Sequence, residues 1–430
     1  MAKQRTDVDR IGFSRPLTAC ALCLAVCLAA GPAYGTGRVT DINRMRGILT
    51  DAASKRDKLA ADTLAHYLKR IYGAKLPVNP EGVEPSPDAR DVILVGRKIA
   101  LAAGTITAEE LEKVKCDGFV LRAREGRMSL AGYSGHGTVY AVYELLEQLG
   151  CRFYSRSLEV IPSSQASIIQ DIEFADKPVF EHRTGRWWAA RTSVGLTGDP
   201  RQAMNPELFT RESGSNLWID HTAGYLVPKL LYYDEHPEYY ALRRDGNRIP
   251  KTTPDSRIFL CTSNPDVRRI ALERMLGWMR RQPDRRYFWV TPGDGPDWCQ
   301  CEHCKELDRE EGNYSDRYLK FVNHIARGVK KEFPDNRINT FAYTGTEYAP
   351  VKERPESNVI VVYCPYFGRG RSCVHSWTHP LNANSLFELK GWLDVAPNSM
   401  GIAEYNIGYV PSWDAMAQRL KWAAEQGIRR

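Results

Sequence analysis

The stretch RIFLCTSNPDVRRIALERMLGWMRRQPDRRYFWVT, residues 257–291, decides the fold of this chain. Its two ends, Arg257–Cys261 and Tyr287–Thr291, are apolar and aromatic runs of strand length. Between them, Pro265–Arg281 carries apolar residues at helical spacing. A strand, a helix and a second strand in this order predict a βαβ unit built around a parallel sheet.

The same alternation continues on both sides of this unit. Further strands are predicted at Glu181–Ala189, Asn216–Asp220, Ile338–Tyr343, Val359–Tyr363 and Met400–Tyr405. Further helices are predicted at Ser315–Phe333, with Ser315 as N-cap and Pro334 as stop, Leu381–Leu393 and Trp413–Gln426. Residues 178–430 therefore predict an α/β domain of the (β/α)8 TIM-barrel type. Because such a barrel needs eight strands and seven are found, we expect the polypeptide to stop before the last repeat, unless one strand is hidden.

A smaller domain is expected before the boundary at Asp176-Lys-Pro178. Residues 39–172 predict a compact α+β domain. Its expected elements are a helix that stops at Gly73, a strand at Asp91–Gly96, a strand pair at Gly118–Arg122 and Arg127–Ala131, and a helix at Thr138–Leu149.

The first 35 residues have the three-part layout of a secretory signal peptide. A basic stretch ends at Arg15, an apolar run follows from Leu17 to Ala30, and small residues come at Ala33-Tyr34-Gly35. The apolar run is too short for a permanent membrane span. We therefore expect export to the periplasm or the medium, with an uncleaved anchor as the alternative.

Composition limits the classes of molecule that this chain is expected to bind. The net charge of +7 is mild and dispersed, which argues against nucleic acid. Aromatic residues make up 10% of the chain, and their flat faces suit sugar rings, although they equally suit a packed core. A carbohydrate partner is therefore expected.

Acidic residues at strand ends are the candidate catalytic groups. Asp294 follows the fourth predicted strand and Glu404 ends the seventh, so the two face each other across the mouth of a barrel. A carboxylate pair flanking a glycosidic bond is the minimal machinery of a glycosidase. Either group alone is equally a solvated loop carboxylate or an ion-pair partner, and Asp297 and Glu347 are weaker rivals.

Other polar and aromatic residues near strand ends could line the substrate site. These candidates are Arg183, Trp187, His221, Tyr343, Tyr363 and Asn406. Trp187 and Trp188 are adjacent and point to opposite faces of a strand, so at most one of them serves the site. A structural role is an equally good interpretation of His221.

Cys299, Cys301 and Cys304 form the sharpest local motif, CQCEHC. Three thiols this close can bind one Zn²⁺, with Cys261 or His303 as the fourth ligand. The alternative is one disulfide and a spare thiol, which an exported protein permits. Four protein ligands leave no open position, so zinc here would brace a loop, and the hydrolysis itself requires no cofactor.

Several segments together resemble known carbohydrate-processing proteins. Residues 137–154, GTVYAVYELLEQLGCRFY, resemble the small α/β domain that precedes the barrel in α-glucuronidases and β-hexosaminidases. The segments HPEYYAL (236–242), LCTSNP (260–265), the GDG and CQCEHC motifs, and SDRYLKFVN (315–323) resemble domain-of-unknown-function family 4838, to which glycoside hydrolase family 163 is related. The resemblance covers residues 40–430.

The resemblance implies a bacterial glycoside hydrolase acting on O-glycosidic bonds of complex glycans, similar to endo-β-N-acetylglucosaminidases. Hexosaminidases of this kind carry an adjacent Asp-Glu pair after the fourth strand, whereas this chain has Gly293-Asp294-Gly295, so only Asp294 carries over. The alternatives are an α-glucuronidase-like hydrolase and a glycan-binding protein without activity on a barrel scaffold.

Overall fold

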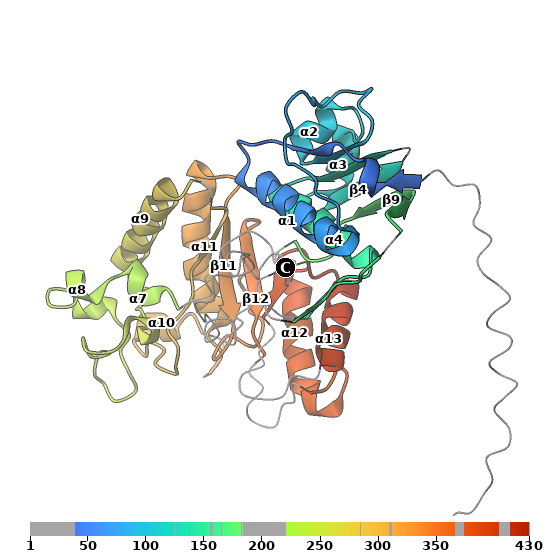
Figure 1. The fold of residues 1–430 in the computed structure, drawn as a ribbon. Helices are drawn as coiled ribbons and strands as arrows, with labels where there is room; N and C mark the ends of the chain where they lie inside the picture. Colours follow the sequence, from blue (N-terminus) through green and yellow to red (C-terminus); the bar gives the residue numbers. More distant parts are fainter. Residues whose placement is uncertain are drawn as a thin grey trace, which may run out of the picture.

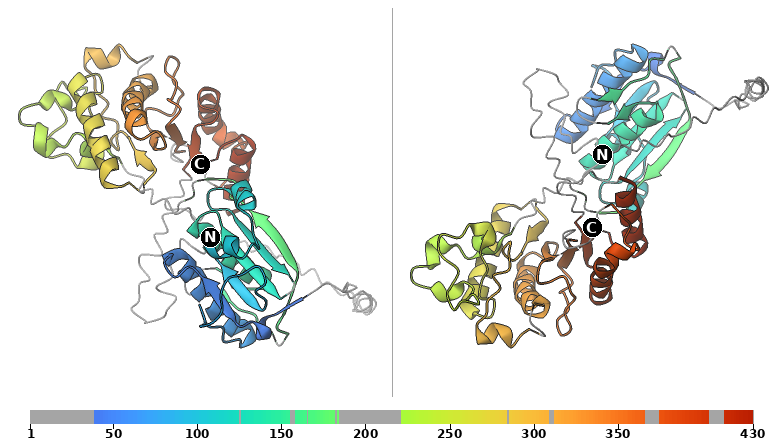
Figure 2. Two further views of the ribbon diagram at one scale, coloured as in Figure 1. Left: turned by 90° about the horizontal axis from the view of Figure 1, so that it is seen from above. Right: turned by 90° about the horizontal axis from the view of Figure 1, so that it is seen from below.

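The computed structural model describes residues 39–124, 126–154, 158–164, 166–181, 183, 221–283, 285–308, 312–365, 374–403 and 413–429. These residues form two domains, which Figure 2 shows as separate bodies. The expected signal segment and the predicted strand Asn216–Asp220 lie outside the described residues, and so does most of the predicted strand Glu181–Ala189.

The first domain contains a five-stranded mixed sheet. Its strands, in spatial order, are β2 (Gly47–Thr50), β3 (Val92–Val95), β5 (Arg127–Gly132), β4 (Phe119–Arg124) and β9 (Ile172–Asp176). The first three are parallel, and β4 runs antiparallel to both of its neighbours, β5 and β9. Because β9 belongs to this sheet, the domain extends to Asp176 rather than ending at residue 172.

Helices cover both faces of this sheet. α1 (Lys55–Tyr72) and α4 (Gly135–Gln148) lie side by side on one face (Figure 1), and α1 ends at Gly73 as predicted. α4 begins earlier than predicted, since the Ser134 side chain caps it by accepting from the Gly137 amide. The other helices and two small ribbons are α2 (Arg97–Ala102), α3 (Ala108–Val114), η1 (Ile42–Arg44), β1 (Val39–Asp41) with β8 (Ile168–Gln170), and β6 (Arg152–Phe153) with β7 (Glu159–Val160).

The second domain is built on four parallel strands that neighbour one another in chain order. They are β10 (Tyr287–Trp289), β11 (Arg337–Ala342), β12 (Val359–Tyr363) and β13 (Met400–Ile402). The long helices are α9 (Pro265–Arg281), α11 (Ser315–Glu332), α12 (Ala383–Val395) and α13 (Trp413–Glu425). The short ones are α7 (Ala223–Leu226), α8 (Lys229–Tyr232), α10 (Glu302–Lys305), η3 (Pro237–Tyr239), η4 (Asp255–Arg257) and η5 (Pro380–Asn382). The predicted alternation of strands and helices, and a mixed α/β class, are thereby confirmed.

The two faces of the parallel sheet have different surroundings. Phe288, Val361 and Tyr363 belong to the large core that the helices share. Residues of opposite parity, among them Trp289 and Phe341, form a second buried cluster on the other face. A parallel sheet with both faces apolar is covered on both sides.

Two predictions of local structure are wrong. Arg257–Cys261 does not join the parallel sheet, because it pairs with the preceding chain through an antiparallel bridge between Tyr240 and Leu260. Ser315 is the first helical residue and not the N-cap, since its hydroxyl donates to the Tyr348 carbonyl while Asn313 accepts from its amide.

Among the described residues, no helix combines the length and the apolar character needed to cross a bilayer.

Candidate functional site

Asp294 lies just beyond the carboxyl end of β10, on a short rim segment. Its amide donates to the Ser256 carbonyl at 2.8 Å, which fixes the backbone against the preceding loop. Its side chain is 48% exposed, so the carboxylate is open to solvent. The carboxyl end of a parallel sheet is where ligands bind in α/β folds. Asp294 therefore has the position and access that a catalytic carboxylate needs.

Gly293 allows the rim segment to pass close to the neighbouring chain. A Cβ at this position would lie 2.6 Å from the Ile258 carbonyl oxygen, which is backbone and cannot swing away. The residue before Asp294 must therefore be glycine for the rim to keep this path.

We expect Gly293→Ala to lower the free energy of unfolding by about 1–3 kcal/mol, because the added methyl overpacks against backbone. The matched control is Gly277→Ala in α9, where the nearest atom to a new Cβ is the Arg281 guanidinium at 3.5 Å. That change should stabilise the protein by about 0.5–1 kcal/mol through helix propensity. Urea unfolding of both variants measures the two shifts, and equal shifts would contradict the close approach.

His221 stands beside Asp294 with a defined tautomer. Its Nδ1 is 2.8 Å from the Pro292 carbonyl oxygen, and a carbonyl only accepts, so Nδ1 carries the proton. Its Nε2 is 3.8 Å from Asp294 Oδ1, which is too long for a hydrogen bond. The Nε2 edge of the imidazole thus faces the carboxylate.

Aromatic rings continue the site from His221 along the sheet. The His221 ring centroid is 5.7 Å from that of Phe341 and 6.3 Å from that of Tyr343. Trp289 packs against Phe341 at 5.0 Å from the β10 side. Tyr343 is half-buried at the rim, so the structure brings Asp294, His221 and Tyr343 together in one place.

Other predicted site residues lie elsewhere. Tyr363 is fully buried on the helix-covered face and its hydroxyl donates to Glu388, since strand alternation turns it away from the Phe341 side. Arg183 pairs with Asp117 of the first domain at 3.2 Å. The carboxylate of Glu347 accepts from the Gly345 amide and holds its own turn. Trp187, Trp188, Glu404 and Asn406 lie outside the described residues.

The cysteine motif closes into a compact cluster. The Sγ atoms of Cys261, Cys299, Cys301 and Cys304 all lie within 4.8 Å of one another, and all four residues are free cysteines. His303, the other expected donor, is 85% exposed and lies outside this cluster.

Arg317 supports this region from inside α11, a feature that the sequence analysis missed. Its guanidinium donates to the Cys299 carbonyl at 2.7 Å and pairs with Asp308 at 3.3 Å, with only 1% of its side chain exposed. Burial raises the pKa of Asp308 to about 6, and the Arg317 charge opposes that rise. Arg317 is a charged residue in a predicted amphipathic helix, and such residues usually face solvent. The sequence around it therefore did not indicate this buried contact.

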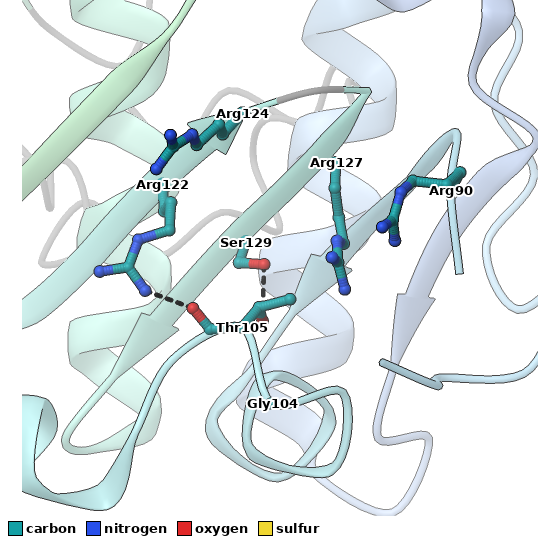
Figure 3. A pocket seen from close by; sticks show the side chains of 7 residues that line it. All are labelled: Arg90, Gly104, Thr105, Arg122, Arg124, Arg127 and Ser129. Carbon is teal, nitrogen blue, oxygen red and sulfur yellow. Dashed lines mark hydrogen bonds between the residues drawn. The ribbon is translucent and has the colours of Figure 1, made fainter. Parts of the chain in front are cut away.

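A second concavity lies in the first domain (Figure 3). This pocket of about 350 Å³ is lined by Arg90, Gly104, Thr105, Arg122, Arg124, Arg127 and Ser129. Arg122 is already neutralised by Glu110 and Glu173. Burial, and then the nearby Arg90 charge, lower the pKa of Arg127. Its lining contains no carboxylate, so the pocket does not offer the acid–base pair of a glycosidase.

Comparisons with known proteins place the chain in a family. Similar solved structures include the N-acetyl-β-hexosaminidase of Streptomyces plicatus, at 15% identity and a TM-score of 0.41 over 85% of this chain and 71% of that one. The β-N-acetylhexosaminidase of Bacteroides fragilis has 12% identity and a TM-score of 0.41, over 83% and 71%. Flavobacterium johnsoniae chitobiase has 14% identity and a TM-score of 0.41, over 86% and 56%. No curated protein matches. The model of the "Domain of unknown function (DUF4838)" family matches residues 153–430, more than half of the chain, and the chain belongs to this family.

Proposed function

We propose that this protein is an exported glycoside hydrolase that cleaves O-glycosidic bonds of complex glycans. The observation that carries the proposal is the exposed Asp294 carboxylate at the carboxyl edge of a parallel sheet, with His221 facing it and Tyr343 beside it. An acidic group at a strand end and an aromatic face are elements that a sugar-cleaving site combines.

In this proposal Asp294 acts on the bond that is broken, as the general acid or as the nucleophile or base. Glu404 supplies the second carboxylate, which glycosidases of both stereochemical classes need. Ala403, the residue before it, packs with the cluster around Trp289 and Phe341, and its amide donates to the Tyr363 carbonyl at 2.9 Å. Ala403 therefore lies at the same end of the sheet as the strand end that Asp294 follows.

The proposal extends to the architecture and the substrate. The four described parallel strands would be part of a (β/α)8 barrel, with the Trp289 and Phe341 face turned inward. The substrate would be an N-glycan cleaved in the manner of the endo-β-N-acetylglucosaminidases of glycoside hydrolase family 163, or a glucuronic-acid-bearing glycan. The Tyr343 ring would stack on the apolar face of one sugar.

The direct test is turnover. The protein is incubated with N-glycan oligosaccharides and, in parallel, with glucuronoxylan fragments, and new reducing ends are followed by mass spectrometry. We expect new reducing ends to form from one of the two substrates. NMR of the first-formed anomer then assigns retention or inversion. Saturable binding by calorimetry without new reducing ends would replace the hydrolase by a glycan-binding protein.

A further inference from the structure

We propose that Cys261, Cys299, Cys301 and Cys304 form a four-thiolate site for one structural Zn²⁺. The sulfur positions carry this inference. Cys261 Sγ lies 3.6 Å from Cys301 Sγ and 3.9 Å from Cys304 Sγ. A tetrahedron with Zn–S bonds of about 2.3 Å has edges of about 3.8 Å, so these separations are those of sulfurs around one ion.

The same distances do not suit a disulfide. An S–S bond measures about 2.05 Å, roughly half of the separations seen here. A disulfide also joins two sulfurs, whereas here Cys261 meets three sulfurs of the segment Cys299–Cys304, and all four lie close together. Cys261, Cys299 and Cys304 are buried and Cys301 is half-buried, so the cluster is protected from solvent as closed structural zinc sites are.

Hydrogen-bond donors surround the sulfurs. The Leu242 amide donates to Cys299 Sγ at 3.3 Å. The Ser263 hydroxyl lies 3.1 Å from Cys304 Sγ and 3.4 Å from Cys261 Sγ, within reach to donate to a thiolate. Donors of this kind orient ligand sulfurs and offset their negative charge, which is the outer shell that metal sites require.

The proposed ion would join two segments, at Cys261 and at Cys299–Cys304, and backbone hydrogen bonds attach both of them to residues 239–242. Cys261 comes just before α9, and its amide donates to the Tyr239 carbonyl at 2.9 Å. Gln300, between two of the ligands, donates its amide to the Leu242 carbonyl at 2.7 Å. The segment Cys299–Cys304 follows the rim segment that carries Asp294 along the chain. Four protein ligands leave no open position, so the ion braces this rim and takes no part in chemistry.

The test measures metal and not activity, so it stands apart from the hydrolase proposal. The full chain is purified without a metal-affinity resin and its zinc is determined by plasma mass spectrometry. We expect about one zinc per chain, released when a mercurial reagent blocks the thiols. Replacement by Co²⁺ should give the intense visible bands of a tetrahedral thiolate complex.

Variants identify the ligands. Cys304→Ser and Cys301→Ser should each lose at least half of the bound zinc. Cys116→Ser, at an exposed cysteine outside the cluster, and His303→Ala should keep it. If a ligand variant fails to fold, the zinc content of the unaltered chain still decides whether the protein binds zinc. Four reactive thiols without zinc, or a cysteine pair mapped as a disulfide in non-reduced peptides, would overturn the proposal.

Discussion

Asp294→Asn is expected to lower kcat/KM for glycan hydrolysis by about 10²–10⁴-fold, the usual contribution of a general acid or base. Asparagine has the same shape as aspartate, and the backbone amide of residue 294 still donates to the Ser256 carbonyl. The rim segment should therefore keep its path. In the proposed reaction, the substitution removes the group that gains or loses a proton at the bond being cleaved, and it replaces the carboxylate that faces His221. Binding of the glycan should change little.

The control for this experiment is Asp297→Asn, three residues further along the same rim. If Asp294 is the reacting group, Asp297→Asn should retain most of the activity, and Glu404→Gln should lose it. Steady-state kinetics on one defined oligosaccharide, with affinity measured separately, distinguishes these variants. Loss of activity in Asp297→Asn with full activity in Asp294→Asn would assign the catalytic role to Asp297 instead.

Arg317→Ala is expected to destabilise the second domain by about 3–5 kcal/mol, the cost of removing one partner of a buried ion pair. The substitution leaves the Asp308 carboxylate, whose side chain is 10% exposed, without the Arg317 charge. It also removes the hydrogen bond to the Cys299 carbonyl and the guanidinium that stacks 4.7 Å above the Tyr314 ring.

The matched control is Arg280→Ala, which breaks an ion pair with Glu332 between exposed side chains. Such pairs contribute about 0–1 kcal/mol. All ten tryptophans lie beyond residue 180, so tryptophan fluorescence during urea unfolding reports the second domain alone. Similar losses in both variants would mean that Arg317 acts as a surface charge does.

Local sequence patterns predicted the elements well where one signal dominated. α9 matches its predicted bounds, because Pro265 at its first position and Asn264 as N-cap fix its start. β12 also matches, since Val359–Tyr363 is an apolar run that begins after polar residues 356–358 and ends shortly before Pro365. The error at Arg257–Cys261 has the opposite cause: the run is equally apolar, and its antiparallel partner lies in a loop with no strand signal.

The candidate site was predictable in part. Asp294 and the cysteine cluster follow from residue type and from their positions after strands. Two other features were not predictable. Tyr363 lies on the face of the sheet that is set by the alternation of its strand, and its hydroxyl bonds to Glu388 in a distant helix. The Arg317 contact with Asp308 depends on packing in the folded chain. Periodicity gives no information about either.

The contact between Arg183 and the first domain has a consequence for synthesis. Asp117, its partner, also accepts from the Ser134 hydroxyl at the start of α4, and the Arg183 guanidinium lies 6.0 Å from the Tyr140 ring. These groups belong to a sheet and helix pair that is complete at Asp176, before most of the second domain has been translated. Domains fold in turn from the N-terminus as they leave the ribosome. The first domain can therefore act as a preformed template, on which the opening segment of the second is anchored while its later strands are still being made.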